Sequence, residues 1–178
     1  DPVSTGNATF NGELLRIQKN TGAASDTATY VPSATAGSGL VTLAGMGDVN
    51  FTGTTNVDFV NLTLVNVQTA TAADTLTLAD GNTATNGAAI AAGYSIAAAA
   101  DLTVTGANAV VGLRNITNTN IDTVTGGGNG NDSVTISSGT GAHGLTNLTI
   151  STGTGTDTVT ASGALTVAGN ITVTSQQI

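Results

Sequence analysis

One short phrase recurs along the chain and dictates most of what the chain can fold into. It begins with Asp or Asn and continues with apolar residues that alternate with Thr or Ser, as in Asp132-Ser-Val-Thr-Ile136. Such alternation places apolar side chains on one face of an extended segment, which is typical of β-strands with one buried face. The phrase occupies residues 61–65, 74–78, 101–105, 122–125, 132–136, 147–151, 157–161 and 170–174. Turns rich in Gly, Asn and Ser separate the copies, so the sequence predicts an all-β fold from about residue 49 onward.

The scarcity of large side chains favours one all-β architecture over another. Aromatic residues make up only 3% of the chain, whereas Gly occurs 24 times. A parallel β-solenoid has a thin interior that Val, Ile, Leu and Ala can fill, and its corners accept Gly and Asn at positive φ. The uneven spacing of the phrases predicts irregular coils with looped-out corners. We therefore expect a parallel β-solenoid (β-helix), with a β-sandwich as the alternative.

The first part of the chain reads differently from the rest. Residues 13–19 form the one segment that mixes charges of both signs, and the turn-rich stretch 31–39 follows it. We expect residues 1–48 to be an N-terminal cap or the first strands, and residues 49–178 to hold the solenoid repeats. The two parts are expected to form one continuous domain.

The charge balance excludes several partners. The net charge is −8, and the three basic residues, Arg16, Lys19 and Arg114, are spread along the chain. Such a chain has no basic patch for phosphates, so we expect no binding of nucleic acid. Its uncharged runs consist of Ala, Gly, Thr, Ser and Asn and are too polar for a membrane span. The chain opens at Asp1 without an apolar signal core, and we interpret it as a processed product or an excised piece.

Few residues could carry out catalysis. The chain has no Cys, one Glu (Glu13) and one His (His143), and His143 lies in a Gly-rich turn. Enzymes that cleave polysaccharides need basic residues or a close pair of carboxylates. The sequence therefore predicts that the protein is not an enzyme.

The sharpest local signal is the segment 127–135, which reads Gly-Gly-Asn-Gly-Asn-Asp-Ser-Val-Thr. It matches the nonapeptide G-G-x-G-x-D-x-U-x at each fixed position, and residues 152–160 form a second copy that lacks the first Gly. The segment resembles the RTX family of calcium-binding parallel β-rolls in secreted bacterial proteins. The resemblance implies a Ca²⁺ ion held by the carboxylates of Asp132 and Asp157 and by the backbone carbonyls of Gly128, Gly130, Gly153 and Gly155. The residues themselves leave an alternative open, in which both Asp side chains cap tight corners by accepting hydrogen bonds from backbone N–H groups.

A broader likeness covers most of the chain. The Thr-, Gly- and Asn-rich phrases, such as residues 101–106 and 169–174, resemble the repeat regions of large bacterial surface proteins. Those proteins include filamentous-haemagglutinin-like adhesins and the β-strand repeat proteins of planctomycete and cyanobacterial type. The resemblance implies an extracellular location at the cell surface and a structural or adhesive role.

The ends of a solenoid indicate a partner. The backbone groups of their edge strands are unpaired and can form hydrogen bonds with another chain unless the edges are capped. Residues 170–178 carry no charge, so we expect an uncapped edge on which identical subunits stack head to tail, although a chain cut from a longer array would end in the same way. This predicts a subunit of a self-assembling fibre, sheath or matrix. The alternative is a calcium-stiffened adhesin or binding module, excised from a larger surface protein, whose ligand is a glycan, a surface or ice.

Overall fold

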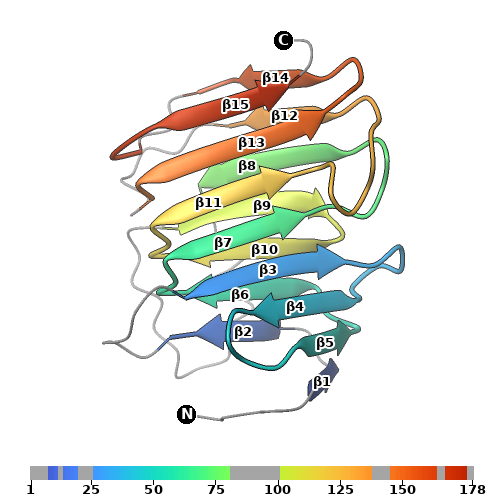
Figure 1. Ribbon diagram of the computed structural model, residues 1–178, viewed down its shortest axis with the longest axis vertical. Coiled ribbons are helices and arrows are strands. Elements are labelled where there is room, and N and C mark those ends of the chain that lie inside the picture. The colour runs from blue at the N-terminus through green and yellow to red at the C-terminus, as the bar shows by residue number, and fades with distance from the viewer. Residues whose placement is uncertain are drawn as a thin grey trace.

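The computed structural model describes residues 8–11, 14–19, 26–80, 101–137, 145–163 and 167–175, and these form strands, turns and short loops without any helix. Two mixed, open sheets lie one behind the other (Figure 1). Sheet A has the order β1 (Ala8–Asn11), β5 (Val49–Thr52), β4 (Gly39–Leu43), β3 (Thr27–Pro32), β7 (Leu64–Gln68), β11 (Asn118–Asp122), β13 (Asn147–Gly153), β15 (Ile171–Ser175). Sheet B has the order β14 (Thr158–Ala161), β12 (Ser133–Ile136), β8 (Thr75–Asp80), β9 (Asp101–Ala107), β10 (Ala109–Arg114), β6 (Asn56–Val60), β2 (Leu14–Gln18). The prediction of an all-β fold is confirmed, and residues 1–48 contribute strands β1 to β4 to the same two sheets.

The chain passes repeatedly from one sheet to the other. From β5 to β8, and again from β10 to β15, successive strands alternate between sheet A and sheet B. Within each sheet the strands of these two runs are parallel where they are neighbours, as in β7–β11–β13–β15 and β8–β12–β14. Two open sheets that share a core are also compatible with a sandwich-like arrangement.

Two antiparallel excursions interrupt the alternation, and the sequence analysis did not predict them. In sheet A the chain turns back through β3, β4 and β5, and in sheet B it turns back through β8, β9 and β10. Asn108, at φ 73°, makes the tight reversal between β9 and β10. Its side-chain amide donates to the carbonyl oxygens of Ser33 (2.7 Å) and Thr35 (2.8 Å), so it ties this reversal to the turn between β3 and β4.

The core lies between the sheets and follows the predicted alternation. In β8 the side chains of Leu76 and Leu78 are fully buried, whereas Thr75, the first residue of the strand, is exposed. Small aliphatic side chains fill most of the space, and the described aromatic residues lie toward the N-terminal half. Tyr30 and Phe51 stack there with ring centroids 5.7 Å apart. The described residues contain no helix that is long and apolar enough to cross a membrane.

Asn side chains connect neighbouring strands on the outer face of sheet A. The amide of Asn120 donates to Asn66 Oδ1, and that of Asn147 donates to Asn118 Oδ1, each at 2.8 Å. Aligned parallel strands place equivalent residues side by side, so the side-chain amide of one Asn can donate to the side-chain oxygen of the Asn on the next strand. These Asn side chains therefore help to keep the neighbouring strands of sheet A in register.

Candidate functional site

Three Asp residues stack at the corners where the chain crosses from sheet A to sheet B. Asp74, Asp132 and Asp157 immediately precede β8, β12 and β14, and these strands are paired in register. The backbone N–H of Asp74 donates to Asp132 Oδ1 at 2.9 Å, and the N–H of Asp132 donates to Asp157 Oδ1 at 3.1 Å. The carboxylates of Asp132 and Asp157 thus each cap the backbone of the preceding corner.

A buried Thr completes each corner. The hydroxyls of Thr69, Thr123 and Thr152 donate to Oδ2 of the Asp in the same corner, at 2.6, 2.5 and 2.9 Å respectively. We call these three Asp and three Thr residues the Asp–Thr column. All six are buried, with exposed fractions of 6% or less. Hydrogen bonds to an ionised carboxylate are about twice as strong as neutral ones, so the column joins three successive corners firmly.

The Gly residues of these corners allow the close stacking. A Cβ atom on Gly130 would overlap the carbonyl oxygen of Ala72, and one on Gly155 would overlap the carbonyl oxygen of Gly130. The corners therefore pack backbone against backbone, which only Gly permits. Gly128 has a different role, because its φ is 87° and a Cβ there would have nothing within 4 Å. Its backbone makes the left-handed turn that reverses the chain.

These contacts locate every residue of the predicted calcium site. Asp132 and Asp157 lie in adjacent corners, as do the turns that contain Gly128 and Gly153, the latter with φ 73°. The hydrogen bonds are those of the capping alternative, and they satisfy both oxygens of each of these carboxylates. Among the described residues, no group of three or more acidic or His side chains is arranged to hold a metal ion. Calcium binding stays a prediction.

Sequence reasoning missed the other members of the column. Asp74 ends a turn without Gly, so the nonapeptide pattern does not include it, and only the register of β8 with β12 brings it into the stack. Thr69 and Thr152 each stand five residues before their Asp, which is a local signal. Thr123 stands nine residues before Asp132, because a longer loop separates them.

A second buried polar cluster lies on the outer face of sheet B. Arg16 Nη2 is 3.0 Å and Arg114 Nε is 3.3 Å from Oδ2 of Asp58, whose side chain is 3% exposed. These two Arg residues are spread far apart in the sequence, but the pairing of β2, β6 and β10 brings both to one carboxylate. The cluster joins the three strands. Glu13 and His143, the residues considered for catalysis, lie outside the described residues.

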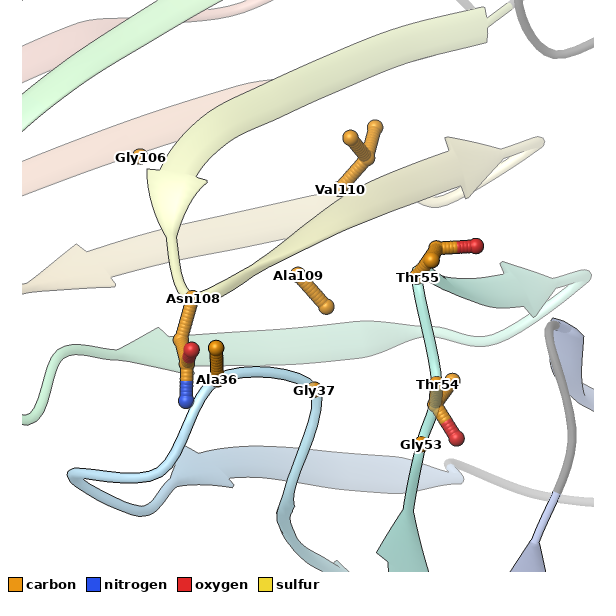
Figure 2. A pocket seen from close by; sticks show the side chains of 9 residues that line it. All are labelled: Ala36, Gly37, Gly53, Thr54, Thr55, Gly106, Asn108, Ala109 and Val110. Atoms are coloured by element: carbon orange, nitrogen blue, oxygen red, sulfur yellow. The ribbon is translucent and has the colours of Figure 1, made fainter.

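A shallow hollow of about 610 Å³ lies beside the reversal at Asn108. Figure 2 shows that the side chains that line it are small. They come from the turns around Gly37, Gly53 and Asn108, with Thr54 and Ala109 among them. The lining carries no charged side chain, and the Gly residues at 37 and 53 have positive φ that the turns themselves require.

The chain was also compared with known proteins. No protein-family model, no curated protein and no solved structure matches it.

Proposed function

We propose that this protein is a non-enzymatic extracellular structural protein, a β-solenoid subunit of a self-assembling cell-surface fibre, sheath or matrix. The observation that carries the proposal is the Asp–Thr column. It repeats one contact from layer to layer, where a layer is a strand of sheet A, a strand of sheet B and the corner that joins them. A contact of this kind joins any layer to an equivalent one. It is suited to extension by further layers rather than to binding a single ligand.

The winding of the chain supports the β-solenoid part of the proposal. Alternation between the sheets, parallel neighbours and stacked corners are the features that define such coils. The antiparallel excursions β3–β4–β5 and β8–β9–β10 are then insertions into two coils, and the second of them accounts for the wide interval between the phrases at residues 74–78 and 122–125. The two sheets remain continuous across both insertions.

The described edges support self-assembly. β14 and β15 are the last strands of their sheets, so each pairs on one side only among the described strands. The backbone N–H of Asp157, which stands where the column would continue, has no acceptor among the described residues. Edge groups of this kind pair with a further strand when one is supplied.

The extracellular location rests on the resemblance of the Thr-, Gly- and Asn-rich phrases to bacterial surface proteins. The composition agrees with this, because only 8% of residues are charged. Rows of Thr and Asn give strands a polar outer face without long charged side chains.

Negative-stain electron microscopy of the purified chain tests the proposal, combined with light scattering after size-exclusion chromatography. Samples in millimolar calcium and in chelator should both contain uniform filaments, because the column is held by hydrogen bonds within the protein. Monomers in both samples would refute self-assembly. Monomers whose folding requires calcium would instead support the calcium-stiffened adhesin, whose ligands would be Asp132 and Asp157.

A further inference from the structure

β14 and β15 lie at the same end of the two described sheets (Figure 1). Inward-facing apolar side chains are exposed at this end. Ile171 of β15 is aligned with Leu148 of β13, yet Ile171 is 42% exposed whereas Leu148 is 0% exposed. Val159 of β14 is only partly buried, while its aligned neighbour Val134 is fully buried. The described core is therefore open at this end.

The backbone at this end also offers hydrogen-bonding groups. The N–H groups of Thr158 and Ser162 donate to carbonyls in the β12 layer, at 2.8 Å each. Successive residues of a parallel strand direct their N–H and C=O groups to opposite sides. The groups of Val159 and Ala161 consequently point away from β12, toward the open edge. A strand placed there would find donors and acceptors beside apolar side chains.

The strands at the two ends of each sheet run in the same direction. Between β1 and β15 in sheet A, two neighbouring pairs are antiparallel, β5–β4 and β4–β3. Between β2 and β14 in sheet B, two pairs are antiparallel as well, β10–β9 and β9–β8. An even number of reversals restores the direction. A copy moved along the stack without being turned over would thus bring parallel strands together, as in the interior of the molecule.

Charge distinguishes the two ends. Asp157 is the one charged residue of the segment 145–175. At the β2 end Arg16 and Arg114 share the carboxylate of Asp58, and Lys19 is paired with Asp26 at 2.8 Å, so three cations face two carboxylates in these ion pairs. Two β14–β15 ends brought together by a twofold axis would oppose two Asp157 carboxylates without a cation. Contact between unlike ends avoids this repulsion.

From these four observations we infer that the β14–β15 end binds the β1–β2 end of a second copy, so that copies add head to tail with parallel strands. The inference rests on the proposed self-assembly and gives it a surface and a polarity. The second copy covers Ile171 and Val159 and supplies backbone partners for the edge of β14. When copies are related by translation along the stack, a contact between unlike ends does not close into a ring, and it continues as an open filament.

Cysteine cross-linking tests the polarity, because the chain has no Cys of its own. Gln18 in β2 and Thr160 in β14 are both exposed and lie on the outer face of sheet B. The double variant Gln18→Cys/Thr160→Cys, treated with a short bis-maleimide, should give a ladder of oligomers, while each single variant should stay monomeric in denaturing gels. Cross-linked dimers of the Thr160→Cys variant alone would overturn the inference in favour of a twofold contact and leave self-assembly intact. Filaments without any ladder would also overturn it.

A second pair of variants tests the surface. Ile171→Lys places a charge on the uncovered end of the core, whereas Thr172→Lys places the same charge on the exposed outer face of β15. Ile171→Lys should weaken assembly at least tenfold in light scattering, with Thr172→Lys unchanged and both variants folded by circular dichroism. Equal assembly of the two variants would refute this surface. Absence of assembly in the unmodified protein would refute the proposed function itself.

Discussion

Replacing Asp132 by Ala should destabilise the protein strongly. The change removes the acceptor of the Asp74 N–H (2.9 Å) and of the Thr123 hydroxyl (2.5 Å), both of which are buried. Hydrogen bonds to a charged group contribute about 1.5–3 kcal/mol each, and a buried donor left unsatisfied costs about 1–3 kcal/mol. The Thr123 hydroxyl can turn to the carbonyl of Ser151, which is 3.4 Å away, so its loss is partly compensated. We expect a net loss of about 3–5 kcal/mol.

Asp132→Asn is the matched comparison. Its Oδ1 still accepts from the Asp74 N–H, and its new amide can donate to the Thr123 hydroxyl, which then donates to Ser151. The expected loss is about 1 kcal/mol. Asp48→Ala serves as a control, since Asp48 is half-buried and lies outside the column. That variant should stay within about 0.5 kcal/mol of the parent protein.

Urea unfolding followed by circular dichroism measures these differences, in millimolar calcium and in chelator. With a slope of about 2 kcal/mol/M, Asp132→Ala should lower the midpoint by about 1.5–2.5 M in both solutions. Equal losses for the Ala and Asn variants, present in calcium and absent in chelator, would refute the hydrogen-bonded column and identify Asp132 as a calcium ligand. A loss below about 0.5 kcal/mol for the Ala variant would refute the stabilising role of the column.

Substitutions at Gly130, Tyr30 and Asn108 test other contacts of the fold. Gly130→Ala should lower the free energy of unfolding by about 3 kcal/mol, because the new Cβ would overlap the neighbouring backbone. Gly128→Ala should lower it by about 1 kcal/mol, because of its positive φ alone, and thermal unfolding compares the two variants. Burial raises the pKa of Tyr30 to about 12, although the hydrogen bond from the Ala109 N–H acts in the opposite direction. The unfolded chain loses this proton near pH 10, so about 2–3 kcal/mol of stability should disappear between pH 10 and 12, and Tyr30→Phe should abolish that loss. Asn108→Gly keeps the backbone turn but removes the hydrogen bonds of the side-chain amide, so hydrogen exchange of residues 33–38 should accelerate while the global free energy of unfolding falls by at most about 2 kcal/mol.

The strands could be predicted because their signal is local. Alternation with period two fixes which side chains of a strand face inward, and Leu76 and Leu78 are buried as the pattern requires. The partner and direction of each strand depend on contacts distant in sequence. The excursion through β9 and β10 requires the positive φ of Asn108, and an Asn near a Thr-rich phrase does not by itself predict such a turn.

The candidate site was predictable only in part, for a related reason. Asp132 and Asp157 belong to a recognisable nonapeptide, but their partners come from other layers. The N–H that Asp132 accepts belongs to Asp74, which is 58 positions away in the chain. Similarly, Arg16 and Arg114 are 98 residues apart by number and meet at Asp58 only because β6 lies between β2 and β10.

X-ray diffraction from aligned samples of the purified protein tests the central claim most directly. Copies stacked end to end would place their strands across the filament axis, so the spacing between strands, about 4.8 Å, should appear as a reflection along that axis. We expect this reflection in calcium and in chelator alike. A preparation that yields no filaments to align, or filaments with this reflection perpendicular to the axis, would contradict the proposal that the protein is an end-to-end structural subunit.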